Sequence, residues 1–111
     1  GTVPHDGAER LRRTLAGLVG RRVLLYGVGR HTTELMPVVE ATEADVIGFV
    51  DDDAGRFGGA FEHKPVVAPT EAASTGASDV VISSWLHEED MWRRREVFER
   101  AGLRVHRLYA D

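Results

Sequence analysis

The stretch LLYGVGRHTTEL, residues 24–35, leads from an apolar run through two glycines into a polar segment. The apolar run begins at Val23, is too short for a helix, and is bounded by arginines and a glycine. It therefore predicts a buried strand, whereas the polar segment predicts the start of a helix. Gly27 and Gly29 fall between the two, where a turn either holds a phosphate or only redirects the chain.

The rest of the chain repeats this alternation of short apolar runs and helical segments. The expected strands are 22–27, 46–50 and 79–83, all parallel, a very short one within 65–69, and a closing edge strand over 103–111. The expected helices are one over about 6–19, one over 31–41 that Pro37 kinks or shortens, one or two turns over 70–76, and the longest over 87–102. Strands that are apolar without alternation are buried on both faces by helices. The pattern therefore predicts one α/β domain over residues 1–111, a small Rossmann-like three-layer sandwich with a mostly parallel sheet of about five strands.

Composition limits the class of protein. Of 111 residues, 42% are hydrophobic and 29% are charged, a balance typical of a globular chain rather than a disordered one. No apolar stretch approaches the roughly 20 residues of a membrane-spanning helix, and the first residues lack a signal-peptide pattern, so we expect no membrane span and a cytoplasmic location. The net charge of -4 argues against nucleic acid as a partner. With no cysteine and no metal-ligand spacing among five histidines, we expect no metal site.

The glycine turn matches part of a dinucleotide-binding pattern. Gly27 and Gly29 occupy the first two positions of G-x-G-x-x-G, where the first glycine allows the bend and the second lets backbone approach a pyrophosphate. Thr32 replaces the third glycine, and its hydroxyl could cap the helix or donate to a phosphate. Asp51 lies 24 residues after Gly27, at the end of the second strand, where an acid normally accepts hydrogen bonds from ribose. The alternative is that the glycines only turn the chain and that residues 51–53 form a solvated turn.

Other polar and aromatic residues follow the third parallel strand, at the edge of the sheet where ligands bind in open α/β folds. Ser83 and Ser84 could contact such a ligand, and Ser84 could equally cap the following helix. Trp85 and Trp92 are interpreted as packing residues rather than as a base-stacking platform. The three arginines at 93–95 are interpreted as a solvated face.

The predicted binding site combines the glycine loop, the acids and the serines. Within it, His31 could reach a phosphate oxygen, although a histidine at a helix start is more often exposed to water. The predicted binding residues are Gly27, Val28, Gly29, Arg30, His31, Thr32, Asp51, Asp52, Ser83 and Ser84.

The segments LLYGVGRHTTEL, VIGFVDDD, PVVAP and VVISS, in this order, resemble the Rossmann-like nucleotide-binding domains attached to bacterial surface-polysaccharide enzymes. These include the N-terminal domains of sugar acyltransferases, which bind nucleotide sugars, and the CoA-binding-like domains of nucleotide-sugar epimerase and glycosyltransferase relatives. The resemblance spans roughly residues 21–109. It implies the following places in the site: Gly27, Gly29 and His31 at the phosphate, Asp51 and Asp52 near ribose or base, and Ser83 and Ser84 on the crevice floor.

These features predict a nucleotide-recognising module without catalytic residues of its own. Its ligand would be NAD, a nucleotide sugar or, less favoured, CoA. The module would be a domain or a relative of a bacterial nucleotide-sugar or polysaccharide biosynthesis protein. We expect a small-molecule nucleotide as its partner, with a homodimer or attachment to a larger enzyme. One alternative is a protein-interaction or oligomerisation module that keeps the fold without a ligand. The other is a small NAD-dependent oxidoreductase or sugar-modifying enzyme, but Tyr26 is followed four positions later by Arg30, so the Tyr-x-x-x-Lys pair of short-chain dehydrogenases is missing.

Overall fold

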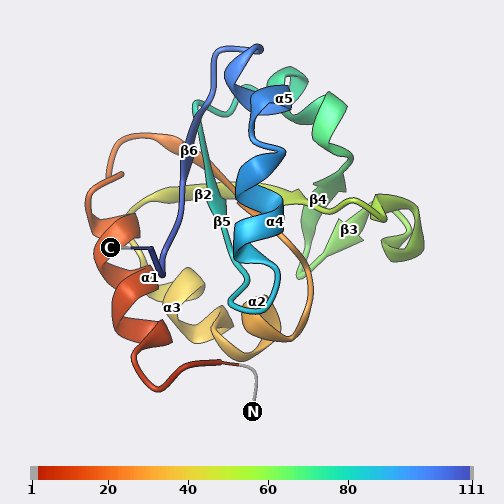
Figure 1. Ribbon diagram of the computed structural model, residues 1–111. Helices are drawn as coiled ribbons and strands as arrows, with labels where there is room; N and C mark the ends of the chain where they lie inside the picture. The colour runs from red at the N-terminus through yellow and green to blue at the C-terminus, as the bar shows by residue number, and fades with distance from the viewer. Residues whose placement is uncertain (1–2, 111) are drawn as a thin grey trace.

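Six strands form a mostly parallel sheet in the computed structural model, which describes residues 3–110 (Figure 1). The strands are β1 (Arg22–Tyr26), β2 (Asp45–Val50), β3 (Ala60–Phe61), β4 (Lys64–Val67), β5 (Asp79–Ile82) and β6 (Arg104–His106). Their order across the sheet is β3-β4-β2-β1-β5-β6, and only the β3–β4 pair is antiparallel. The predicted α/β class and the parallel arrangement of the strands at 22–27, 46–50 and 79–83 are therefore confirmed, and the fold is compatible with a Rossmann-like one.

The expected count of about five strands is too low by one, because β3 was not predicted. This strand is two residues long and pairs with β4 across a tight turn in which Glu62 and His63 have positive φ angles of 49° and 65°. A two-residue strand after a glycine-rich segment has no apolar run to reveal it. The closing edge strand is confirmed as β6, although it is shorter than expected, and residue 111 lies outside the described residues.

The helical segments alternate with the strands, as expected, but two of them are divided. The helices are α1 (Gly7–Ala16), α2 (Arg30–Glu34), α3 (Met36–Ala41), η1 (Ala54–Phe57), η2 (Pro69–Thr75), α4 (Glu88–Arg93) and α5 (Glu96–Glu99), where η marks a 3-10 helix. The expected interruption near Pro37 occurs at Leu35, since a proline is tolerated at the start of α3 but not within a continuous helix. The segment 87–102 is not the longest helix, because its backbone tightens to i→i+3 bonds at Arg94 and Arg95 and separates α4 from α5.

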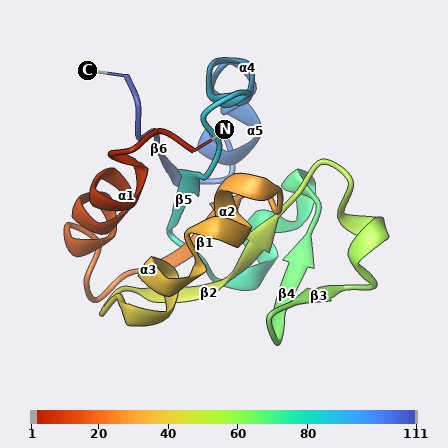
Figure 2. The ribbon, with the colours of Figure 1, turned by 90° about the horizontal axis from the view of Figure 1, so that it is seen from below.

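Helices cover both faces of the sheet. Successive residues of β1 alternate between two apolar clusters: Val23 and Leu25 pack with residues of α1, α3 and β2, whereas Leu24 and Tyr26 pack with residues of η2, α4 and α5. Figure 2 shows the same division, with α1 and α3 on one side of the sheet and α4 and α5 on the other. This burial on two faces is the physical reason that the parallel strands are continuously apolar. Within residues 3–110, no helix has the length and apolarity that crossing a membrane requires.

The order of the strands places a reversal beside β1. From β1 the chain moves outward through β2 and β4, and it then returns to the other side of β1 to form β5 and β6. In the register of these pairs, Tyr26 lies opposite Val50 of β2 and Ile82 of β5. The three strands therefore end at one level, and the loops that follow them leave from the same edge of the sheet.

Candidate functional site

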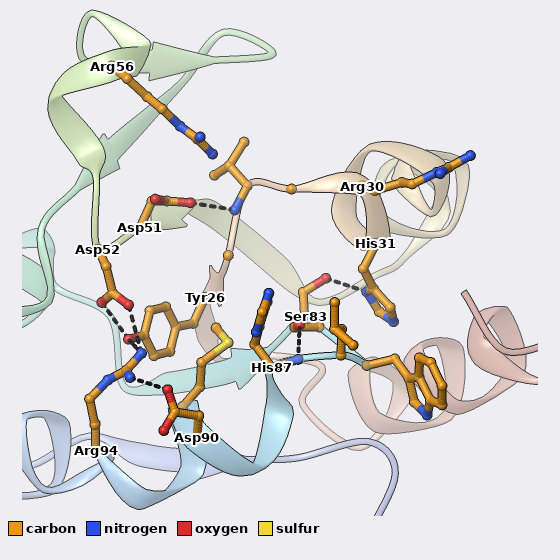
Figure 3. Close-up of a pocket in the computed structure, with 17 residues that line it drawn as sticks. Tyr26, Arg30, His31, Asp51, Asp52, Arg56, Ser83, His87, Asp90 and Arg94 are labelled. Carbon is orange, nitrogen blue, oxygen red and sulfur yellow. Dashed lines mark hydrogen bonds and ion pairs between the residues drawn. The ribbon is translucent and has the colours of Figure 1, made fainter. Parts of the chain in front are cut away.

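The carboxyl ends of β1, β2 and β5 surround a cavity of about 540 Å³ (Figure 3). It is lined by residues 27–31 after β1, by residues 51, 52 and 56 after β2, by residues 83–87 after β5, and by one face of α4. All the predicted binding residues line this cavity except Thr32. Its position matches the general rule that ligands of open α/β sheets bind where the strand order reverses. Its size falls within the roughly 300–1,000 Å³ of small-molecule sites.

The two glycines of the loop after β1 differ in their environment. Gly27 has a φ of +111°, which favours glycine, and a Cβ there would lie 3.1 Å from the carbonyl oxygen of Ser83. Its amide donates to the carbonyl of Val50 at 2.7 Å, which ties the loop to the end of β2. Gly29 has an extended backbone with φ of -111°, and a Cβ there would meet no atom within 4 Å. Close packing within the protein therefore accounts for Gly27, whereas the space above Gly29 is open.

Asp51 braces this loop from the end of β2. Its Oδ2 accepts a hydrogen bond from the amide of Val28 at 2.8 Å, and its Oδ1 accepts one from the amide of Asp53 at 2.9 Å. Each carboxylate oxygen has a second lone pair, so the two bonds leave acceptor capacity for a ligand hydroxyl. The contact of Asp51 with ribose stays a prediction, and the structure adds a bracing role for the same carboxylate.

Buried polar side chains form a continuous chain of hydrogen bonds under the loop. Thr32 Oγ1 contacts the carbonyl oxygen of Gly27 and lies 2.7 Å from Ser83 Oγ. Ser83 Oγ lies 2.8 Å from His31 Nδ1, and His31 Nε2 lies 2.5 Å from the hydroxyl of Tyr109. One arrangement uses each proton once: Tyr109 donates to His31, His31 to Ser83, Ser83 to Thr32, and Thr32 to the Gly27 carbonyl. Thr32 therefore supports the loop from below rather than facing the cavity.

His31 is buried, with 5% of its surface exposed, so the interpretation as a water-exposed histidine is wrong. Desolvation by burial lowers the pKa of His31 to about 4, which keeps the ring neutral at pH 7. Burial raises the pKa of Tyr109 to about 12, so its phenol keeps the proton that it donates to His31. A base of such low pKa, with both ring nitrogens already bonded, is poorly suited to abstract a proton near neutral pH.

A second polar cluster joins β1, the loop after β2, and α4. The hydroxyl of Tyr26 donates to Asp52 Oδ1 at 2.6 Å, and the guanidinium of Arg94 donates to Asp52 at 2.7 Å and to Asp90 at 2.7 Å (Figure 3). Burial and the bond to Asp52 raise the pKa of Tyr26 to about 12, and the bond to Tyr26 together with the acids raises the pKa of Arg94. Sequence reasoning did not include Arg94 in the site, because its partner Asp52 lies 42 residues away in the chain and no local spacing links the two. Arg94 is exposed, as the solvated-face interpretation expects, but its guanidinium is also fixed by Asp52 and Asp90 at the edge of the cavity.

The turn after β5 carries Ser84, Trp85 and Leu86. Ser84 Oγ accepts a hydrogen bond from the amide of His87 at 3.1 Å, so this serine caps the turn that leads into α4. Trp85 was interpreted as a packing residue, and this interpretation is wrong, because its side chain is 48% exposed at the cavity. Trp92 does pack against the core, and the guanidinium of Arg95 lies over its ring at 4.2 Å.

Two arginines flank the loop after β1. Arg30, at the start of α2, pairs with Glu34 at 2.7 Å and extends outward. Arg56, in η1, stacks on the ring of Phe57 at 4.6 Å and makes no ion pair within residues 3–110. Figure 3 shows Arg56 reaching toward the loop from the side of β2. An unpaired guanidinium beside an open glycine backbone is a favourable place for an anionic group.

In comparisons with known proteins, no family model, curated protein or solved structure matches this chain. In the part of the chain that the structure describes, no group of three or more His, Cys, Asp or Glu side chains is placed to hold a metal ion. The cavity and its side chains are therefore the basis for inferring function.

Proposed function

We propose that this chain is a Rossmann-like three-layer module that binds a nucleoside diphosphate ester, either NAD or a nucleotide sugar, with CoA as the less favoured third ligand. The observation that carries the proposal is the cavity at the carboxyl ends of β1, β2 and β5, where the strand order reverses. Open α/β sheets bind their ligands at this point because the loops on its two sides diverge. The sequence resemblance to the nucleotide-binding domains of bacterial surface-polysaccharide enzymes supports the same class of ligand.

The phosphates of the proposed ligand lie over the loop after β1. The open space above Gly29 lets an oxygen approach the backbone, and Arg56 supplies a positive charge without an acidic partner among the described residues. Arg30 also lines the cavity, but its guanidinium is paired with Glu34 at 2.7 Å, so Arg56 is the cation on which the proposal relies. The guanidinium of Arg56 offsets part of the negative charge that a pyrophosphate brings.

The nucleoside of the proposed ligand lies on the side of β2. There Asp51 keeps free acceptor capacity, and Asp52 is held by Tyr26 and Arg94. A fixed pair of carboxylates at the end of the second strand suits the hydroxyl groups of a ribose. Ser83 and His31 form the opposite side of the cavity floor.

The proposal assigns no catalytic residue to the chain. His31 is committed to Ser83 and Tyr109, and the charges of Arg94, Asp52 and Asp90 are paired with one another. We place the module in a protein of bacterial nucleotide-sugar or polysaccharide biosynthesis, as a homodimer or attached to a larger enzyme, on the resemblance alone.

Isothermal titration calorimetry with NAD, UDP-glucose and CoA tests the proposal directly. Saturable binding of NAD or UDP-glucose with one site per chain is the expected result. Failure of all three compounds to bind would contradict the proposal, and a dimer seen by light scattering would then favour the interaction module. Consumption of NADH or of a nucleotide sugar in the presence of the protein would favour the enzyme instead.

A further inference from the structure

Two large apolar side chains are exposed at the rim of the cavity. Trp85 is 48% exposed and its neighbour Leu86 is 66% exposed, and both line the cavity. Within residues 3–110, Val19 is the remaining large hydrophobic residue of comparable exposure, and it lies apart, in the turn after α1. Adjacent apolar side chains exposed beside a binding cavity indicate a surface that a ligand covers.

The turn that presents these residues is held at both ends. The amide of Ser83 donates to the carbonyl of Tyr26 at 2.9 Å, which ties the start of the turn to β1. The amide of His87 donates to Ser84 Oγ at 3.1 Å, which closes the turn before α4. Trp85 is thus carried by fixed backbone, so a ligand that stacks on it has little chain entropy to overcome.

Trp85 and the acids reach the cavity from opposite sides of β1. Asp51 and Asp52 follow β2, Trp85 follows β5, and Gly29 follows β1, which lies between those two strands. Figure 3 shows this separation, with the two acids on one side of the cavity and Ser83 on the other. A ligand whose ribose faces the acids and whose phosphates cross Gly29 therefore directs its distal group toward Trp85.

We propose that Trp85, together with its exposed neighbour Leu86, is the specificity-determining contact for a ring carried on the second phosphate of the ligand. This inference rests on the proposed function and names which part of the ligand is selected. An indole offers a flat apolar face, on which a nicotinamide ring or the C–H face of a hexose can stack. A nucleoside diphosphate without such a ring, or the flexible chain of CoA, gains little from it.

The test compares ligands with and without the distal ring, namely UDP-glucose against UDP and NAD against ADP. Calorimetry on Trp85→Ala should show a loss of affinity of about 5- to 10-fold for UDP-glucose or NAD, with a change below about twofold for UDP and ADP. Trp85→Phe, which keeps a flat ring, should retain most of the affinity. Val19→Ala removes an equally exposed apolar side chain far from the cavity, and it should change none of these values.

Tryptophan fluorescence gives an independent readout, because the chain has two tryptophans. In a Trp92→Phe variant, Trp85 emission should change on titration with the ringed ligands and stay nearly constant with UDP or ADP. Equal losses for ringed and ringless ligands in Trp85→Ala, or no loss at all, would overturn this inference while leaving the proposed function standing. If none of the compounds binds the unmodified protein, the proposed function fails and this inference fails with it.

Discussion

The imidazole of His31 and the phenol of Tyr109 are hydrogen-bonded at 2.5 Å although 78 residues separate them in the chain. Their rings meet edge to face, with centroids 5.6 Å apart. Through its other nitrogen, His31 bonds to Ser83 on the cavity floor. The C-terminal segment is therefore joined to the floor of the proposed binding site through one neutral histidine.

Burial of His31 makes stability depend on pH. The pKa of this imidazole falls from 6.5 to about 4 on folding, so below about pH 6.5 the unfolded chain takes up a proton that the folded chain does not. The free energy of unfolding should therefore decrease as the pH falls from 6.5 toward 4. After allowance for solvent screening, this histidine should account for roughly 2 kcal/mol by pH 4.5. Urea denaturation at pH 7 and at pH 4.5 measures the decrease.

The matched variant is His31→Gln, which keeps a donor and an acceptor but does not titrate in this range. Its stability should decline less between the two pH values than that of the unmodified protein, since the remaining four histidines contribute equally to both. An equal decrease in the free energy of unfolding of the two proteins between pH 7 and pH 4.5 would show that His31 is not responsible.

Substitution of the two loop glycines should affect different properties, namely the stability at Gly27 and ligand binding at Gly29. Gly27→Ala places a side chain at a φ of +111° and 3.1 Å from the Ser83 carbonyl oxygen, so it should lower the stability by about 1–3 kcal/mol. Gly29→Val meets no atom within 4 Å, so its unliganded melting temperature should stay close to that of the unmodified protein. Its methyl groups occupy the space proposed for the phosphate, and binding should be lost.

Thermal denaturation with and without ligand separates these effects. A ligand at 100 times its dissociation constant stabilises the folded state by about 2.7 kcal/mol, and each kcal/mol shifts the midpoint of a domain of this size by roughly 4–8 °C. The unmodified protein should show this shift and Gly29→Val should not. A folded Gly29→Val variant that keeps the full shift would mean that the loop only turns the chain.

The carboxylate of Asp51 should select against a 2′-phosphate. It lies at the end of β2, where it repels the added negative charge but can accept from a free 2′-hydroxyl. Calorimetry should therefore give tighter binding for NAD than for NADP. Asp51→Ala should reduce this preference. It should also weaken the binding of NAD by about 1–3 kcal/mol, because the ribose loses its acceptor and the amides of Val28 and Asp53 lose the carboxylate that fixes the loop. NADP as the tighter ligand would contradict the position of Asp51 at the ribose.

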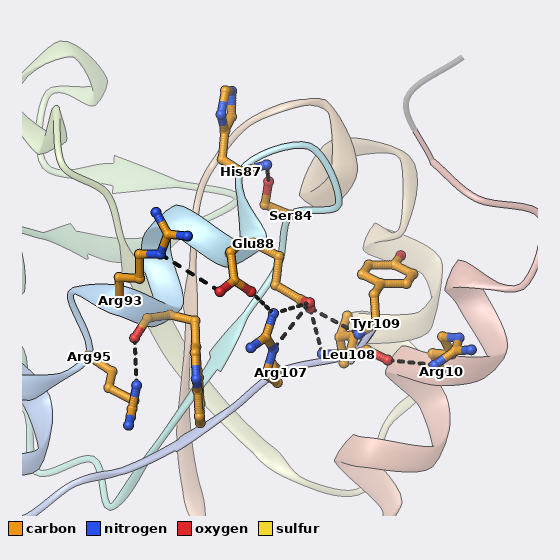
Figure 4. Close-up of polar contacts among 11 residues, drawn as sticks. Arg10, Ser84, His87, Glu88, Arg93, Arg95, Arg107, Leu108 and Tyr109 are labelled. Atoms are coloured by element: carbon orange, nitrogen blue, oxygen red, sulfur yellow. Dashed lines mark hydrogen bonds and ion pairs between the residues drawn. The ribbon is translucent and has the colours of Figure 1, made fainter. Parts of the chain in front are cut away.

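Glu88, the first residue of α4, should matter for stability much more than its neighbour Glu89. The buried carboxylate of Glu88 accepts hydrogen bonds from the amides of Leu108 and Tyr109, at 2.7 and 3.0 Å, and pairs with Arg107 (Figure 4). Glu88→Ala removes these charged hydrogen bonds and should lower the free energy of unfolding by about 1.5–3 kcal/mol.

Glu89→Ala is the control, since Glu89 also pairs with Arg107 but is 60% exposed. Its free energy of unfolding should stay close to that of the unmodified protein, because solvent screens such a pair. Chemical denaturation measures the free energy of unfolding of both variants. An equal loss of this free energy in the two would rule out a special role for the buried carboxylate.

Local sequence patterns were sufficient to predict the class of fold and the edge of the sheet at which the cavity lies. The apolar runs after Arg22, Asp45 and Asp79 predict parallel strands, because a strand that is apolar on both faces has to be covered on both faces. The glycines at 27 and 29 mark the turn where the first strand ends. Since parallel strands end at one edge of a sheet, the acids and serines that follow the other strands were expected to meet that turn, and they do.

Only the tertiary structure decided which side chains meet across the chain. The pairing of Arg94 with Asp52 spans 42 residues, and that of His31 with Tyr109 spans 78. No periodic pattern records such contacts, because they depend on how the helices dock on the sheet. Docking also buries His31 and leaves Trp85 exposed, the reverse of what each residue type suggested. Periodicity reports which face of an element is apolar, whereas the partner of a single polar or aromatic side chain is set by packing in three dimensions.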